Sequence, residues 1–203
     1  MAIAHKLHWN RRYTQEYQGH RPPRFWLLDH MDFVQMRAQL VRTQGRTPQA
    51  LDVACGTGRN AFCLAEEGWH VTGVDISEQA VSLAQERASH CGLAGRMDFT
   101  VADLDEWRPD ALRYDLITCF FFLDRTLWPA MRRALRPDGL LIMETFNAHR
   151  RDGFPSDFLL APGELHAEVR RWGWEILASR SDGPDLPRPT DAIVALKPAW
   201  LVA

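Results

Sequence analysis

The segment Leu51-Asp52-Val53-Ala54-Cys55-Gly56-Thr57-Gly58-Arg59-Asn60 places two glycines between an apolar run and an amphipathic run. Residues 50–54 predict a buried strand, and residues 59–67 predict a helix. Gly56 and Gly58 let the backbone turn tightly and approach a ligand, because neither carries a Cβ. The free amides at the start of the helix favour a negatively charged group. This strand, turn and helix therefore predict a ligand site at the end of a strand.

The same alternation of apolar and amphipathic runs continues along the chain. It predicts further strands at 70–75, 97–102, 114–121, 140–146, 174–180 and 192–197, and helices at 77–91, 125–135 and 162–172. Strands that alternate with helices are typical of a parallel sheet covered on both faces. Before the first strand, residues 31–41 predict one more helix, whose apolar face comprises Met31, Phe33, Val34, Met36 and Leu40.

Length and composition favour an ordinary globular protein. The 203 residues suggest a single domain, 1–203, in which residues 1–48 form an N-terminal arm that packs across the rest. A hydrophobic fraction of 46% with 25% charged residues argues against a disordered or membrane-embedded chain. The N-terminus has no apolar stretch of the signal-peptide type, so we expect a cytoplasmic protein without a membrane partner. The four cysteines show neither zinc-site spacing nor a disulfide framework, and no metal is expected.

Charge is distributed unevenly along the chain. The net charge is −2, but residues 1–48 carry eight Lys or Arg against three Asp or Glu. Such a basic arm can attract an anionic ligand, and it can equally be a solvated surface. The chain as a whole lacks the positive excess that is typical of nucleic-acid-binding proteins, so we expect no nucleic-acid partner.

Three acidic residues help to distinguish the possible ligands. Gly56, Gly58 and Ala61 also satisfy the G-x-G-x-x-A pattern of dinucleotide-binding proteins, which is a weak match alone. Asp75 closes the second strand, where a carboxylate can accept hydrogen bonds from both hydroxyls of a ribose. Asp103 follows the third strand, where it can accept from an adenine amino group. Asp52 lies inside the first strand, and a charge there suits a ligand that carries its own cation.

The chain resembles the class I S-adenosylmethionine-dependent methyltransferases, whose first motif reads acid, x, small, x, Gly, x, Gly. Asp52, Ala54, Gly56 and Gly58 match it, with alanine where the family usually has glycine. The resemblance spans nearly the whole chain. It includes the turn at 135–140 and the opening Trp9-Asn10-Arg11-Arg12-Tyr13, which is similar to small-molecule members. Residues 158–165 are similar to the closing helix of tellurite-resistance and thiopurine-type methyltransferases.

This resemblance implies a Rossmann-like, doubly wound α/β sheet of seven strands in the order 3-2-1-4-5-7-6, with the last strand antiparallel. It implies S-adenosylmethionine as the cofactor, bound at the carboxyl ends of the first four strands, with residues 1–48 covering the site. The predicted cofactor-binding residues are Tyr13, Asp52, Ala54, Cys55, Gly56, Thr57, Gly58, Asn60, Asp75, Ile76, Asp103, Leu104 and Phe120. The predicted acceptor-binding residues are Trp9, Arg12, Phe122, Asn147, Arg150 and Arg151.

Several of these residues have an alternative, purely structural interpretation. Asp75 can initiate the following helix, and Asp103 can belong to a solvated acidic turn. Asp52 can bind backbone amides of the glycine turn rather than the ligand. Trp9 and Tyr13 can anchor the arm in the core, and Arg150 can lie in a solvated basic loop.

The predicted function is methyl transfer from S-adenosylmethionine to a small acceptor of anionic or thiol-like character. Transfer from an activated methyl group requires alignment more than a nucleophilic side chain, so no catalytic residue is assigned. Residues 118–122 lack the Pro-Pro-aromatic stretch typical of enzymes that methylate base or glutamine amino groups. Two alternatives remain: a cofactor-binding module without turnover, and a nicotinamide-dependent oxidoreductase. We expect a monomer or a homodimer.

Overall fold

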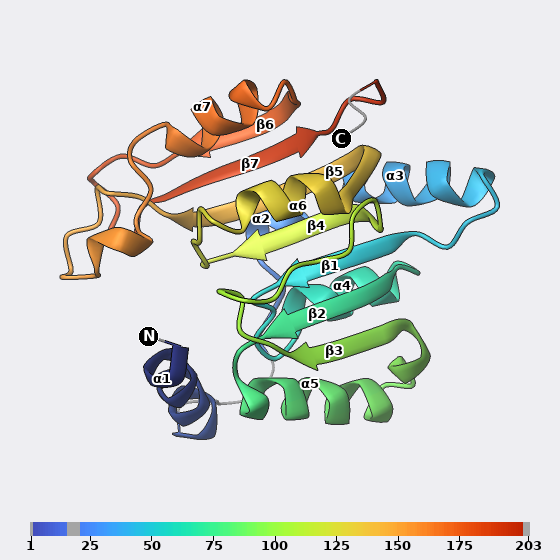
Figure 1. The fold of residues 1–203 in the computed structure, drawn as a ribbon, viewed down its shortest axis with the longest axis horizontal. Coiled ribbons are helices and arrows are strands. Elements are labelled where there is room, and N and C mark those ends of the chain that lie inside the picture. Colours follow the sequence, from blue (N-terminus) through green and yellow to red (C-terminus); the bar gives the residue numbers. More distant parts are fainter. Residues whose placement is uncertain (1, 16–20, 201–203) are drawn as a thin grey trace.

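The computed structural model describes residues 2–15 and 21–200, which fold around a seven-stranded sheet (Figure 1). Its strands are β1 (Gln49–Val53), β2 (His70–Asp75), β3 (Met97–Val101), β4 (Tyr114–Phe120), β5 (Leu135–Phe146), β6 (Glu175–Ser181) and β7 (Thr190–Leu196). Their order across the sheet is β3-β2-β1-β4-β5-β7-β6. The strands from β3 to β5 pair in parallel, and β7 runs antiparallel to β5 and β6. The predicted fold class, strand order and antiparallel last strand are confirmed.

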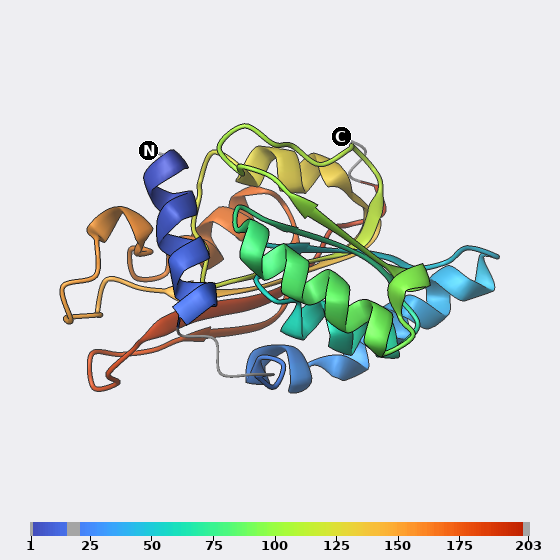
Figure 2. The same ribbon diagram turned by 90° about the horizontal axis from the view of Figure 1, so that it is seen from below.

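Helices cover both faces of the sheet. The elements are α1 (Ala2–Gln15), α2 (Phe25–Leu28), α3 (Met31–Thr43), α4 (Arg59–Glu66), α5 (Glu78–His90), α6 (Trp128–Ala134) and α7 (Glu164–Arg171), with 3-10 turns at Ala94–Arg96 and Ser156–Phe158. One core joins α2 to α5 with the sheet, and a second core joins α6 and α7 with its other face. Figure 2 shows α3 and α4 on one side of the sheet and α6 on the other. No helix of the described segments is long and apolar enough to cross a membrane.

The predicted elements between β4 and β5 need a correction. The helix expected at 125–135 begins only at Trp128, and the strand expected at 140 begins at Leu135. Tyr114 of β4 pairs with Leu135, and the next pair joins Leu116 to Leu140. Residues 136–139 therefore bulge out of the pairing with β4, so the predicted turn lies within β5 rather than before it.

The apolar face predicted for residues 31–41 was partly wrong. Met36 and Leu40 are exposed, whereas Arg37 and Ala38 are buried. The Arg37 guanidinium lies 3.6 Å from the buried carboxylate of Asp115. This ion pair makes the burial of Arg37 possible, whereas the neighbouring Met36 is exposed to solvent.

Helix α1 was not predicted, because its sequence has no continuous apolar stripe. The helix is held by polar contacts instead. Lys6 Nζ donates to Glu78 at 2.6 Å, and the Asn10 side-chain oxygen accepts from the Ser77 hydroxyl at 2.7 Å. Figures 1 and 2 both show α1 beside the carboxyl ends of the strands rather than on a face of the sheet. The other helices of the N-terminal arm, α2 and α3, pack on the sheet face instead.

Candidate cofactor and acceptor site

The glycine turn, residues 54–58, leaves β1 in a backbone conformation that few residues adopt. Ala54, Gly56 and Gly58 have φ angles of 53°, 56° and 77°. Left-handed backbone is unstrained for glycine but costs about 1–2 kcal/mol for alanine. Ala54 therefore carries strain at the position where the family motif usually has glycine. Cys55 N donates to Val74 O at 3.1 Å and Gly58 N to Cys55 O at 3.0 Å, which closes the turn against β2.

Asp75 holds the glycine turn from the end of β2. Its carboxylate accepts from Gly56 N at 2.7 Å and from Ser77 N at 2.9 Å. The side chain is buried, with 7% of the residue exposed. Burial raises the pKa of Asp75, and the two amide hydrogen bonds oppose that rise. One of its oxygens therefore supports the glycine turn and the other supports the start of α5, while Ser77 rather than Asp75 caps α5 by accepting from Ala80 N.

Asp52 lies under the start of α4 and is almost completely buried. Its Oδ1 accepts from the Thr118 hydroxyl at 2.7 Å, and its Oδ2 has no hydrogen-bond partner within the described parts of the chain. Burial raises the pKa of Asp52 to about 7, although the Thr118 hydrogen bond, nearby Arg59 and the Ala61 backbone amide oppose the shift. A buried carboxylate oxygen without a partner is costly unless a ligand supplies a donor or a positive charge. This orphaned atom favours ligand contact by Asp52.

Tyr13 of α1 lies directly over the glycine turn. A Cβ built on Gly56 would collide with the Tyr13 hydroxyl oxygen. Burial and the negative charge of Asp75 raise the pKa of Tyr13, so its hydroxyl stays neutral. Trp9 packs against the same tyrosine, with 6.2 Å between ring centroids, and the Arg12 guanidinium lies 5.1 Å from the Trp9 ring centre. The end of α1 thus lies beside the glycine turn.

The acidic corner after β3 is more exposed. Asp103 is half-buried, and its Oδ1 accepts from Asp105 N at 3.0 Å. Leu104 is buried, whereas Ile76, at the corresponding position after β2, is partly exposed. Ala102 N donates to Asp75 O at 2.9 Å, which joins the two corners. Asp75 and Asp103 therefore lie at adjacent strand ends, where one ligand can contact both.

The remaining predicted residues at the turn differ in burial and in their hydrogen bonds. Thr57 is partly exposed. The Cys55 thiol is buried at 3.5 Å from Gly56 O, and burial raises its pKa. Asn60 is buried, and its side-chain oxygen accepts from Arg24 N at 3.0 Å. Asn60 thereby links the residue directly before α2 to the first turn of α4.

The end of β4 turns through Phe121, which has a φ of 57°. Phe120 is buried in the core, whereas Phe121 and Phe122 are partly exposed on opposite sides of the sheet. Phe121 contacts Phe146 with 4.8 Å between ring centroids, and the Arg24 guanidinium lies 4.0 Å from its ring centre. Neither Arg24 nor Phe121 was predicted individually.

Arg24 belongs to a group of arginines at this end of the sheet. Its Nη2 lies 3.7 Å from Glu144 Oε2, while its Nε is buried and finds no acceptor among the described residues. Burial lowers the pKa of Arg59, and the positive charges of Arg24 and Arg21 lower it further. The only carboxylate paired with Arg24 is also bonded by Arg180 at 2.8 Å, among the residues that the structure covers. Positive charge is therefore incompletely balanced here, a feature that the basic composition of the arm indicated only in general.

The loop after β5 contains three predicted acceptor residues in different settings. Asn147 is fully buried: its amide donates to Asp182 O and Asp191, and its oxygen accepts from His149 N. These bonds give it a structural task, since both amide hydrogens are used. Arg150 pairs with Asp152 through two contacts of 2.6 Å and stacks on two phenylalanines, whereas Arg151 is exposed.

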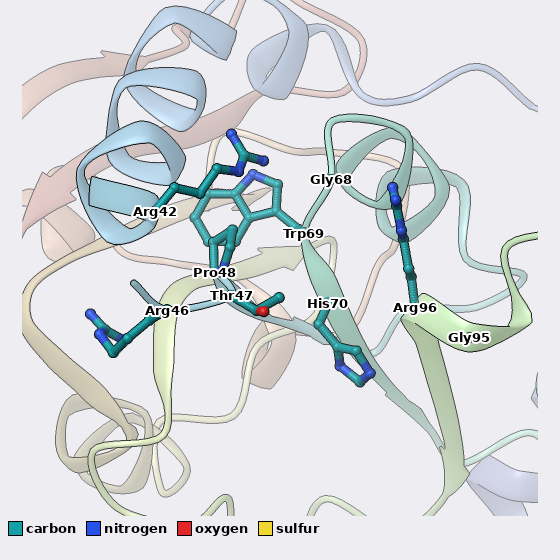
Figure 3. Close-up of a pocket in the computed structure, with 9 residues that line it drawn as sticks. All are labelled: Arg42, Arg46, Thr47, Pro48, Gly68, Trp69, His70, Gly95 and Arg96. Carbon is teal, nitrogen blue, oxygen red and sulfur yellow. The ribbon is translucent and has the colours of Figure 1, made fainter. Parts of the chain in front are cut away.

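Nucleophilic and metal-binding groups are not prominent at the site. Burial raises the pKa of Cys119, and it raises that of Cys63 to about 11. Thiols with raised pKa values are poor nucleophiles near neutral pH. Within residues 2–15 and 21–200, no three His, Cys, Asp or Glu side chains form a group that could hold a metal ion. A cavity of about 420 Å³ lies elsewhere, at the opposite ends of β1 to β3 (Figure 3).

Comparison with known proteins covers the same region of the chain. Residues 50–139 match the model of a family described as a methyltransferase domain, and they contain the glycine turn, Asp75 and Asp103. The Putative methyltransferase YqeM of Bacillus subtilis is 27% identical over 148 residues, which are 66% of this chain and 57% of the relative. The Probable thiol methyltransferase 2 of Arabidopsis thaliana is 35% identical over 127 residues, which are 58% of this chain and 55% of the relative.

This chain therefore spans little more than half the length of these two relatives. A solved structure extends the likeness in fold over nearly the whole chain. The magnesium protoporphyrin IX methyltransferase ChlM from Synechocystis PCC 6803, solved with bound SAM, superposes with a TM-score of 0.62 at 18% identity. The superposition covers 97% of this chain and 96% of that chain.

Proposed function

We propose that this chain, whose residues 50–139 match a methyltransferase-domain family, is a class I S-adenosylmethionine-dependent methyltransferase that transfers a methyl group to a small-molecule acceptor. One observation carries the proposal: a left-handed glycine turn is fixed by Asp75 beside the orphaned, buried Asp52 Oδ2. A turn without a Cβ and a carboxylate with an unused oxygen suit a ligand that combines a nucleoside with a positive charge. The family match supports S-adenosylmethionine as that ligand.

The residues present fit this cofactor. The glycine turn and Asp52 would hold its methionine part, Asp75 its ribose, and Asp103 with Ile76 and Leu104 its adenine. When bound, S-adenosylmethionine supplies a methyl group that is already activated by the positive charge on its sulfur. The chain then has to orient the acceptor and exclude water. Tyr13, over the glycine turn, and Phe121, at the end of β4, are placed to cover the site from two sides.

For the acceptor, the proposal is an anionic or thiol-like small molecule. The incompletely balanced charge of Arg21, Arg24 and Arg59 supports an anionic group at this end of the sheet. The similar proteins include a probable thiol methyltransferase and ubiquinone biosynthesis O-methyltransferases, which supports a small acceptor. A thiolate or another anion arrives without a proton to remove, so the chain needs no general base for it.

We further propose that the protein is a monomer or a homodimer, has no nucleic-acid partner and is located in the cytoplasm. The uneven charge supports a local anion site more than a nucleic-acid surface, since the net charge is −2. Trp9, Arg12, Phe122, Arg150 and Arg151 remain candidates for acceptor contact. Asn147 is the weakest candidate, because its amide is already bonded.

A methyl-release assay tests the proposal. The purified chain is incubated with methyl-labelled S-adenosylmethionine and a panel of thiols, small carboxylic acids and inorganic oxyanions. We expect labelled product with at least one anionic or thiol member. Cofactor binding without methyl release from any member would instead favour a binding module.

Arg24→Ala addresses the acceptor class. This variant should raise the KM for an anionic acceptor about tenfold or more, because a hydrogen bond to a charged group contributes about 1.5–3 kcal/mol. The dissociation constant of S-adenosylmethionine should change less. The opposite split would assign Arg24 to the carboxylate of the cofactor, and unchanged constants would remove Arg24 from the site. Arg188→Ala, at an exposed loop position, is the matched control for loss of one charge.

A further inference from the structure

A cavity of about 420 Å³ lies at the amino-terminal ends of β1, β2 and β3. Its walls include Arg42, Arg46, Pro48, Trp69, His70 and Arg96, which Figure 3 shows as sticks around the cavity. The cofactor residues follow the other ends of the same strands. The five residue steps of β2 between His70 and Asp75 separate the two sites by about 17 Å, at about 3.3 Å per step. The volume falls in the range of about 300–1,000 Å³ that small-molecule sites occupy.

Two of the three arginines in this cavity lack a carboxylate partner in the described part of the chain. Arg42 donates to the backbone oxygen of Glu67 at 2.7 Å, and its guanidinium lies against Gly68. A Cβ on Gly68 would lie 2.7 Å from the mobile end of the Arg42 side chain, and the φ of +84° is what favours a glycine there. Arg96 is exposed and makes neither a side-chain hydrogen bond nor an ion pair with any residue that the structure describes. Figure 3 shows the two side chains on different sides of the cavity.

The third arginine has a partner that already carries excess positive charge. Arg46 contacts the carboxylate of Asp115 at 3.1 Å, and the same carboxylate binds Arg136 at 3.0 Å and lies 3.6 Å from Arg37. Asp115 also accepts from Gln49 N at 3.1 Å. A single buried carboxylate thus faces three guanidinium groups and cannot neutralise the cavity next to it.

Two buried ring nitrogens at the cavity have no partner. Trp69 is 0% exposed, and its Nε1–H reaches no acceptor in residues 2–15 and 21–200. His70 Nδ1 is likewise buried and unbonded across that part of the chain. An indole N–H is a donor only, and leaving it unbonded in the interior costs about 1–3 kcal/mol. A ligand or ordered water with acceptor oxygens would remove this cost.

The negative groups nearby are few. Asp98 lies 3.8 Å from His70 Nε2, at an exposed position on the rim. The carboxylate of Glu67 accepts from the Gln35 amide, so it is directed to α3. Neither carboxylate bonds with Arg42 or Arg96 through its side chain, among the contacts of the described residues. The cavity therefore combines guanidinium groups with space for several atoms.

We propose that this cavity is a second ligand site, separate from the cofactor site, which binds a small phosphate-type dianion. Arg42 and Arg96 bind its oxygens from two sides, because planar guanidinium groups match phosphoryl oxygens in pairs. The ligand is inorganic phosphate or a phosphomonoester, which share the recognised group.

Calorimetric titration of the full chain with inorganic phosphate, at constant ionic strength, tests this proposal. We expect saturable binding by the wild type. Arg96→Ala should weaken it about tenfold or more, because it removes charge-assisted hydrogen bonds without removing any contact of the fold. Arg188→Ala should bind phosphate like the wild type.

A second series with glycerol 3-phosphate identifies the form of the ligand. Tighter binding than that of phosphate supports a phosphomonoester, and equal binding supports phosphate itself. Absence of saturation, or equal affinity in the wild type and Arg96→Ala, would overturn the proposal. Binding of a single-stranded oligonucleotide that Arg96→Ala abolishes, without any effect of phosphate, would overturn it in favour of a nucleic-acid surface. Arg96→Ala should leave S-adenosylmethionine binding unchanged, so the two sites are tested separately.

Discussion

Replacement of Asp75 by asparagine tests how the glycine turn is held. The carboxylate accepts from Gly56 N at 2.7 Å and from Ser77 N at 2.9 Å in a buried position. Asparagine can keep one of these bonds, but its amide group must then face the other N–H. Loss of a charge-assisted bond and a buried unpaired donor cost about 3–5 kcal/mol together. Relief from burying a charge offsets part of this cost, since burial raises the pKa of Asp75. We expect a net loss of about 2 kcal/mol.

For a chain of this size, about 2 kcal/mol corresponds to a melting temperature lower by about 4–8 °C, measured by calorimetry or circular dichroism. The affinity for S-adenosylmethionine should fall at least about tenfold in the same variant. Asp103→Asn is the matched control, because Asp103 is half-buried and its carboxylate accepts, within the described residues, only from Asp105 N. This variant should bind S-adenosylmethionine more weakly, while its free energy of unfolding should change by less than about 1 kcal/mol. A melting temperature for Asp75→Asn within about 1 °C of the wild type would refute the role of this carboxylate in the turn.

Three further predictions concern the same turn. The pKa of Asp52 is about 7 against an ordinary 3.8, so this group destabilises the fold as pH rises from about 4 to 7. A bound cation favours the ionised carboxylate, so the affinity for S-adenosylmethionine should rise with pH below 7, by up to about tenfold per pH unit. Asp52→Asn should remove this pH dependence in binding titrations. Gly56→Ala should lose cofactor binding and stability because its Cβ meets the Tyr13 hydroxyl, and added Tyr13→Phe should recover part of the stability in thermal melts. Ala54→Gly should raise the free energy of unfolding by up to about 1 kcal/mol in denaturant titrations, because φ is 53° there.

Local patterns were sufficient to predict the parts of the fold that depend on nearby residues. Apolar runs located the strands, and Ser77 marked the start of α5, where its hydroxyl accepts from Ala80 N. The glycine turn and the acids after β2 and β3 were located for the same reason. Each of these features follows from residues within a few positions along the chain.

Features that depend on distant residues were not predicted. Helix α1 lacks an apolar stripe and depends on contacts such as Asn10 with Ser77, 67 positions away. The buried Arg37 depends on Asp115, which a pattern within α3 cannot reveal. Asn147 was a reasonable acceptor residue by position, but Asp182 and Asp191 occupy its amide. Contacts of this kind become visible only when the sheet brings its strands together.

The central claim is that the glycine turn and the carboxylates at the ends of β1, β2 and β3 bind S-adenosylmethionine. Calorimetric titration of the purified chain with S-adenosylmethionine, its demethylated product and NAD tests this most directly. The account predicts saturable binding of the first two at one shared site and no binding of NAD. Binding of NAD without binding of S-adenosylmethionine would contradict it.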